Sequence, residues 1–118
     1  MKNYRDLIVW QKAHKNVLQI YKLTKTFPKE EQFGISSQIR RAATSVPTNT
    51  AEGCGKFTQR DFANFLQNAL GSCMEVEYLS FLSFELSFLQ ENEFKNLNKD
   101  INEVKAMLIS LIKKVRKE

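Results

Sequence analysis

The side chains that could support catalysis or bind a metal are few and isolated in this sequence. The chain of 118 residues has one histidine, His14, and two cysteines, Cys54 and Cys73. These three fall short of a structural zinc set, and no serine or cysteine has an evident histidine and carboxylate as catalytic partners. His14 falls on the predicted inward side of its helix, where a hydrogen-bonded structural imidazole is expected. We therefore expect no enzyme activity, no metal, no cofactor and no small-molecule substrate.

Basic side chains form the remaining constellation that could bind a ligand. Lysines line the polar side of the first predicted helix, and others precede the third helix and end the chain. Such clusters can neutralise the phosphates of a nucleic acid. The candidate nucleic-acid-binding residues are Lys12, Lys15, Arg40, Arg41, Lys56 and Arg60. Solvated lysines are also ordinary at helix ends, so charge alone leaves the ligand open.

The adjacent arginines Arg40 and Arg41 are expected to have different roles. Neighbouring residues on a helix point about 100° apart, so both side chains cannot face the same partner. We expect one of them to pair with Glu75 or Glu77 of the third predicted helix, while the other faces a ligand. A structural ion pair and a ligand contact fit the sequence equally well.

Apolar residues recur with helical spacing in four segments, and no segment has useful strand-like alternation. The first helix is expected over about residues 6–27, with Asp6 as N-cap and Pro28 after it. Its inward stripe is predicted to be Leu7, Trp10, His14, Val17, Tyr21 and Thr24, with Ala13, Ile20 and Phe27 beside it. The second helix should begin between residues 30 and 36 and end at Glu52, before Gly53. Pro47 lies inside it and is predicted to kink it, because proline lacks an N–H.

The third helix is expected over roughly residues 59–89, with Thr58 as N-cap. The fourth should start near Asn92 and has a strict heptad of apolar residues, namely Phe94, Leu97, Ile101, Val104, Leu108, Leu111 and Val115. Four such helices predict an all-α fold, a single antiparallel up-down-up-down four-helix bundle over residues 1–118. Surplus aromatic residues on the third helix predict a second buried surface, and hence a homo-oligomer.

Charge is unevenly distributed along the chain, whose net charge is +5. Residues 61–93 contain six acidic and no basic residues, whereas residues 1–27 contain six basic residues and one acidic residue. The molecule should therefore have two electrostatically different faces. No apolar run suits a signal peptide or a membrane span, and the two lone cysteines suit a reducing compartment. These features predict a cytoplasmic location without membrane contact.

Motifs along nearly the whole chain carry a resemblance to a known family. They are DLIVWQKA at 6–13, FP at 27–28, QIRRAA at 38–43, SVPTN at 45–49, AEG at 51–53 and FANFL at 62–66, followed by Ala69, Gly71, Ser72 and Glu75. The sequence resembles the four-helix-bundle proteins encoded within intervening sequences of bacterial 23S ribosomal RNA genes, and is similar to the accessory proteins of diversity-generating retroelements. Thr50 stands where that family more often has an apolar residue.

The resemblance implies a cytoplasmic bacterial protein that forms a ring-like homopentamer and contacts nucleic acid through a positively charged surface. It implies no catalytic residue. The positions that fall on the family motif are Gln38, Arg40, Arg41, Asn49, Glu52 and Gly53.

Two functional hypotheses follow from the charge and the resemblance. The first is a non-enzymatic, oligomeric protein that binds phosphates of RNA resembling ribosomal RNA, or of DNA, with RNA favoured. The second is a protein–protein adaptor, or an accessory subunit of a nucleic-acid enzyme such as a reverse transcriptase. A structural helper without a ligand is a third possibility.

Overall fold

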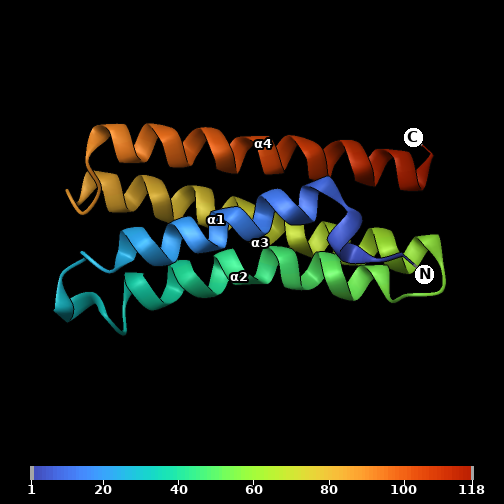
Figure 1. Ribbon diagram of the computed structural model, residues 1–118, viewed down its shortest axis with the longest axis horizontal. Coiled ribbons are helices and arrows are strands. Elements are labelled where there is room, and N and C mark those ends of the chain that lie inside the picture. Colours follow the sequence, from blue (N-terminus) through green and yellow to red (C-terminus); the bar gives the residue numbers. More distant parts are fainter. Residues whose placement is uncertain (1, 118) are drawn as a thin grey trace.

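The structure is a computed structural model that describes residues 2–117. It contains α1 (Ile8–Thr24), α2 (Ile35–Cys54), α3 (Gln59–Glu85) and α4 (Glu91–Arg116), with the short 3-10 turns η1 (Tyr4–Asp6) and η2 (Lys29–Glu31). The four helices lie alongside one another (Figure 1), and no strand occurs between residues 2 and 117. The prediction of an all-α four-helix bundle is confirmed.

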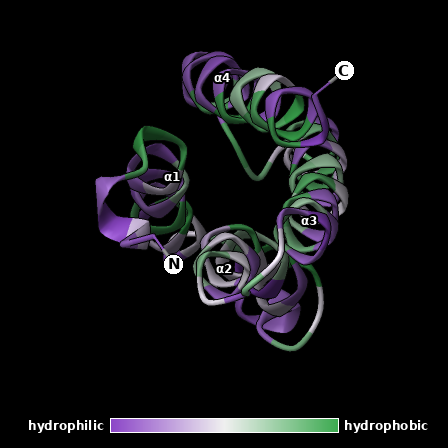
Figure 2. Ribbon diagram, turned by 90° about the vertical axis from the view of Figure 1, so that its right-hand side faces the viewer, coloured by the Kyte–Doolittle hydropathy of each residue, from purple (hydrophilic) through white to green (hydrophobic). Residues whose placement is uncertain are grey.

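The helices are arranged in chain order around a common core, as the end-on view in Figure 2 shows. Two contacts join α2 to α3: Gln38 Nε2 donates to Glu75 Oε2 at 3.5 Å, and Ser72 Oγ donates to Ser45 Oγ at 2.9 Å. Residue numbers rise along α2 while those of its partners fall along α3, so these two helices run in opposite directions. Figure 1 shows that the chain also reverses its direction between α1 and α2 and between α3 and α4.

Two of the predicted helix boundaries are explained by capping. The Thr58 hydroxyl accepts a hydrogen bond from the Asp61 N–H at 3.1 Å, which confirms Thr58 as the N-cap of α3. A capping box between Gln90 and Glu93 starts α4, one residue before the predicted position. The end of α3 differs more from its predicted position, residue 89. The helix ends at Glu85 because Ser87 adopts a left-handed backbone conformation, with φ 66°, and the Phe88 N–H donates to the Ser83 carbonyl.

The predicted start of α1 is wrong, and its inward stripe is correct only in part. Asp6 belongs to η1, which Asn3 caps, and Leu7 precedes the helix. The buried residues are Val9, Ala13, Asn16, Ile20 and Thr24. His14 is exposed and stacks on the Trp10 ring, with 5.1 Å between ring centroids. The reason is steric, because small Ala13 lets α1 approach its neighbours whereas a ring as large as that of Trp10 fits only at the rim.

The heptad pattern of α4 predicted its buried face well. Leu97, Ile101, Val104, Leu108 and Val115 are buried, and Ile112 replaces the predicted Leu111 near the end of the helix. An α-helix has 3.6 residues per turn, so a strict seven-residue pattern drifts around the helix over this length.

Pro47 is buried within α2, and the helix continues to Cys54. The kink at Pro47 stays a prediction. Thr50, the departure from the family pattern, is fully buried, and its hydroxyl donates to the Val46 carbonyl at 2.9 Å. A threonine is tolerated at this core position because its hydroxyl is satisfied within the helix.

Replacing Gly53 with alanine is expected to destabilise the fold by about 1–3 kcal/mol. A Cβ atom there would lie 3.0 Å from both Phe62 Cδ1 and Phe65 Cβ, where the end of α2 packs on α3. Gly55→Ala is the matched control, because its Cβ would meet only the Glu52 carbonyl oxygen at an ordinary 3.4 Å. Urea denaturation of both variants measures the difference. Equal stabilities would contradict the close contact between α2 and α3.

Candidate functional site

Three basic segments meet at one end of the bundle. The N-terminal segment, the turn between α2 and α3, and the last turn of α4 all lie there (Figure 1). The Lys2 N–H donates to the Cys54 carbonyl at 3.3 Å, and the Arg116 guanidinium donates to Gln67 of α3. We call this surface the basic end and define it by Lys2, Arg5, Lys56, Arg60, Lys113, Lys114, Arg116 and Lys117.

The basic end carries a strong excess of positive charge. Against its eight basic residues, the same segments within residues 2–117 contain the acids Asp6, Glu52 and Asp61. None of the ion pairs present among these described residues joins a basic-end cation to an acid. Its cations therefore remain available to an anionic partner.

Aromatic rings support part of the basic end. The Lys56 ammonium lies 4.8 Å from the centroid of the Phe65 ring, and the Lys2 ammonium lies 5.7 Å from that of Phe62. Phe57 follows Lys56 in the turn between α2 and α3 and is 90% exposed. The Phe57 ring is therefore exposed beside the cations, and an exposed aromatic ring can stack on an unpaired base.

The six candidate residues predicted from sequence do not form one surface. Lys56 and Arg60 belong to the basic end, whereas Lys12 and Lys15 lie on α1 where it faces α4. Lys12 forms an ion pair with Glu103, and a hydrogen bond from its ammonium lowers the pKa of the Glu103 carboxyl. The groove beside this pair is also lined by Asp100. The charge of Lys12 is thus matched within the chain, which makes this region a poor phosphate site.

Arg40 holds α2 against α1, contrary to the expectation that one arginine pairs with α3. Its Nε donates to Thr24 Oγ1 at 2.7 Å, and its guanidinium lies 4.6 Å from the Tyr21 ring centroid. The predicted acidic partners are engaged elsewhere: Glu75 accepts from Gln38, and Glu77 pairs with Lys105 at 2.9 Å. The expected pairing is absent because Arg40 lies on the side of α2 that faces α1 and Arg41 makes no ion pair within residues 2–117.

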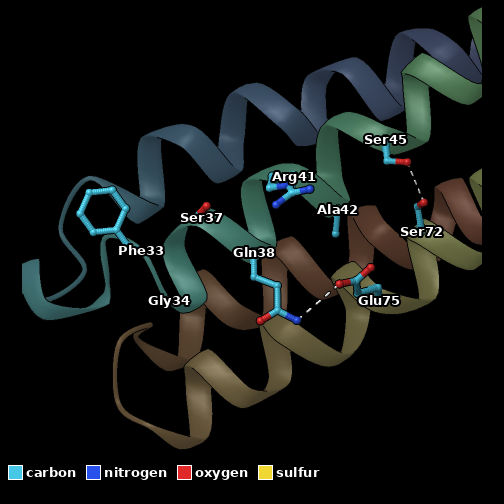
Figure 3. A pocket seen from close by; sticks show the side chains of 9 residues that line it. All are labelled: Phe33, Gly34, Ser37, Gln38, Arg41, Ala42, Ser45, Ser72 and Glu75. Carbon is cyan, nitrogen blue, oxygen red and sulfur yellow. Dashed lines mark hydrogen bonds between the residues drawn. The ribbon is translucent and has the colours of Figure 1, made fainter.

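Arg41 is exposed and makes no ion pair or side-chain hydrogen bond within residues 2–117. It lines two adjoining cavities on α2, one of which is drawn in Figure 3 with Ser37 and Phe33 beside it. A role for Arg41 in contacting a ligand stays a prediction.

Several residues of the family motif have structural contacts. The Asn49 amide donates to the Ser45 carbonyl and hydroxyl, both at 2.9 Å, and Ser45 in turn meets Ser72 of α3. Gly53 allows the close contact with α3 described above. Ser45 and Gly53 of the motif therefore help to fix α2 on α3, whereas Arg40 fixes it on α1.

Neither cysteine is placed for thiolate chemistry. Burial raises the pKa of the Cys73 thiol to about 11, with Glu77 adding to the effect, and burial also raises the pKa of Cys54.

Across residues 2–117, no three His, Cys, Asp or Glu side chains are grouped to hold a metal ion. The same part of the chain has no helix long and apolar enough to span a membrane.

Comparison with known proteins gives a consistent family. Residues 5–110 match the family model described as 23S rRNA-intervening sequence protein. The fold is similar to the crystal structure of a protein of unknown function from the S23 ribosomal protein family of Bacteroides thetaiotaomicron, with 30% identity and a TM-score of 0.84, over 90% of this chain and 99% of that one. The search of curated proteins finds no match. The chain belongs to the family of 23S rRNA-intervening sequence proteins.

Proposed function

We propose that this is a cytoplasmic, non-enzymatic protein that binds nucleic acid as an oligomer, with RNA preferred to DNA. The observation that carries the proposal is the basic end, where three separate segments that contain eight Lys and Arg residues lie at the same end of the bundle. The central contacts are Lys56, in the turn between α2 and α3, and Arg60, in the first turn of α3, because both side chains are exposed.

The size of the basic end suits contact with several phosphates. The molecule measures 44 × 23 × 20 Å, so the end presents a face about 20 Å across. Duplex nucleic acid carries one charge per about 1.7 Å of axis, and a face of that width lies over roughly a dozen phosphates. Each phosphate that a lysine or arginine neutralises releases condensed counterions, which drives binding without regard to sequence.

Two observations favour RNA over DNA. The family description connects these proteins with intervening sequences of 23S rRNA, and structured RNA presents unpaired bases in its loops. Exposed Phe57 can stack on such a base, whereas a continuous duplex offers no base face to it.

A fluorescence-anisotropy titration of a stem-loop RNA and a DNA duplex of the same stem sequence tests this proposal. At roughly 50 mM salt, where electrostatic binding is strong, we expect both to bind and the RNA to bind more tightly. A preference for the duplex DNA would contradict the role of Phe57. Absence of binding by either would overturn the proposed function.

We propose that the protein self-associates through the outer face of α3, as the homopentamer implied by the resemblance. Met74, Tyr78 and Phe81 are spaced by four and three residues, so they share one stripe, and Tyr78 is 60% exposed. Gly71 extends this stripe, and a Cβ there would meet nothing within 4 Å. A glycine inside a helix costs about 1 kcal/mol relative to alanine, and close approach by a second copy explains its presence.

Introducing charge on this stripe, with Met74→Glu and Tyr78→Glu together, is expected to give monomers. Burying unpaired carboxylates in an interface costs several kcal/mol. Light scattering after gel filtration should give about five times the 13.7 kDa of one chain for the native protein, and one chain for the variant.

The control for this experiment carries Ile8→Glu and Leu18→Glu, which change two similarly exposed apolar residues of α1. It should keep the native mass. A native protein that is monomeric at micromolar concentration, or a control that dissociates while the α3 variant does not, would contradict the proposed interface.

The adaptor hypothesis has weaker support. In one form of it a basic partner docks on an acidic α3, but Glu77 is already paired with Lys105 and Glu75 accepts from Gln38. In the other form a polymerase docks on the basic rim, which is the same surface that we propose for nucleic acid. Among the described residues, no cation of the basic end has an acidic partner, and Arg116 alone donates a side-chain hydrogen bond, to Gln67. This difference favours nucleic acid over an adaptor role.

A further inference from the structure

An open cavity of about 470 Å³ lies at the end of the molecule opposite to the basic end. It is enclosed by the last turn of α1, the loop that contains η2, and the first turns of α2. Four cations line it, namely Lys25, Lys29, Arg40 and Arg41, and no acid within residues 2–117 does. The volume is in the range of small-ligand sites.

Ser36 adds a hydroxyl to the lining of this cavity. The residue as a whole is only 7% exposed, but its side-chain oxygen is not among the fully buried, unpartnered ones of residues 2–117, where Ser80 Oγ is the single case. The Ser36 hydroxyl is therefore open to the cavity and can donate a hydrogen bond to an anion there.

The backbone around Ser36 adds further donors. Gly34, the N-cap of α2, has no side chain to cap the helix, and the N–H groups of Ser36 and Ser37 have no acceptor among the described residues. The carboxylate of Glu31 in η2 accepts from the Ile35 N–H at 3.4 Å, and neither Glu30 nor Glu31 lines the cavity. Glu75 lines only the adjoining groove. Free N–H groups and the helix dipole both favour an anion here.

The two arginines of the cavity complement each other. Arg40 is held in place by its hydrogen bond to Thr24 and by the Tyr21 ring, so a ligand does not have to order it. Arg41 has no intrachain partner and can form a bidentate contact with a phosphate. The set of cations and donors fits a phosphomonoester, which carries more charge than the diester of a nucleic-acid backbone.

An aromatic ring marks the rim of the same cavity. Phe33 is 91% exposed, in the loop just before α2. Together with Ser37 and Arg41 it also lines the adjoining groove over α2 and α3 (Figure 3), whose further lining includes the polar side chains of Gln38 and Glu75. A base stacked on Phe33 would thus have polar groups within the groove for its edges.

We propose that this cavity binds a nucleotide through its terminal phosphomonoester, with the base stacked on Phe33. Ser36, Arg40 and Arg41 hold the phosphate, and Lys25 and Lys29 add charge at the entrance. The proposal does not depend on the basic end, which lies at the other end of the molecule.

Isothermal titration of the full chain with adenosine 5′-monophosphate, adenosine and inorganic phosphate tests the site. We expect the monophosphate to bind at least about tenfold more tightly than either adenosine or inorganic phosphate, because only the monophosphate contacts both the cations and Phe33.

The Arg41→Glu substitution should weaken binding of the monophosphate by about tenfold or more. Because Arg41 has no partner within residues 2–117, this substitution should leave the fold intact. Phe33→Ala should reduce its affinity to that of inorganic phosphate, while leaving the latter unchanged.

The variant with Lys56→Glu and Arg60→Glu keeps this proposal separate from the proposed function. It should bind the monophosphate normally even if its RNA binding is lost.

The phosphomonoester could belong to a free nucleotide or to the end of an RNA chain. Short oligoribonucleotides with a 5′-phosphate or a 5′-hydroxyl distinguish these two sources. A phosphate-dependent affinity that Arg41→Glu removes identifies an RNA end, and binding of the free monophosphate alone identifies a free nucleotide.

Three results would overturn the nucleotide site. The first is no heat of binding at millimolar monophosphate, and the second is unchanged binding by the Arg41→Glu variant. The third is equal affinity for the monophosphate and inorganic phosphate together with no effect of Phe33→Ala.

Discussion

Reversing two charges of the basic end, with Lys56→Glu and Arg60→Glu together, is expected to weaken RNA binding by roughly 50-fold at 0.1 M salt. Each phosphate contact contributes about 0.9 to the slope of log affinity against log salt, so losing one contact costs about eightfold at this salt concentration. Both residues are exposed, and Lys56 meets only the Phe65 ring. The loss should therefore come from phosphate contacts and not from the fold.

The matched control for this variant carries Lys22→Glu and Lys99→Glu. These residues are also exposed lysines, and they lie outside the basic end. The net charge changes by the same amount, so a purely non-local effect of charge would weaken both variants equally. Circular dichroism and light scattering should show that both keep their helix content and their mass. Loss of the oligomer in the basic-end variant would make Lys56 and Arg60 structural residues instead.

The largest expected loss of stability is about 3–5 kcal/mol, for Ile101→Ala in the centre of the bundle. Ile101 is fully buried, and it borders a small internal void together with side chains from all four helices. The void is also lined by Ala13, Ala43, Val46, Cys73, Val76 and Val104. Truncation enlarges this void, and four helices held by their other contacts cannot all move inward to fill it.

Urea denaturation followed by circular dichroism measures this effect. Ile101→Val removes one methylene group and is the control, with an expected loss of about 0.5–1.5 kcal/mol. If Ile101→Ala cost no more than Ile101→Val, the four helices would not share the packed core described here.

Elements with one dominant pattern could be predicted from the sequence. The heptad of α4 places Leu97 through Leu108 correctly, and Thr58 with Asp61 marks the start of α3. The inward stripe of α1 could be predicted only in part, because two overlapping sets of residues follow helical spacing there. Thr24 is buried as predicted, and so are Ala13 and Ile20, which were expected beside the stripe. Large rings such as those of Trp10 and Tyr21 dominate a hydrophobicity pattern, whereas close packing of helices selects small Ala13.

The candidate site could be predicted as a set of residue types but not as a surface. Lys12 and Lys56 look alike in the sequence, yet Glu103, distant along the chain, neutralises only Lys12. Arg40 likewise meets Thr24 of another helix, a contact that no local pattern encodes. The exposure of Phe33 could have been predicted from the sequence. A large aromatic residue between Gln32 and Gly34 in a polar loop has no apolar neighbours with which to pack.

The salt dependence of stem-loop RNA binding by the native chain is the measurement that decides the role of the basic end. At least four of its cations should contact phosphates, so log affinity should fall linearly with log salt with a slope of about −3 or steeper. The slope should become less steep by about 1.5–2 in the Lys56→Glu and Arg60→Glu variant. A slope near zero, or an equal slope in the native chain and this variant, would contradict binding of phosphates at the basic end.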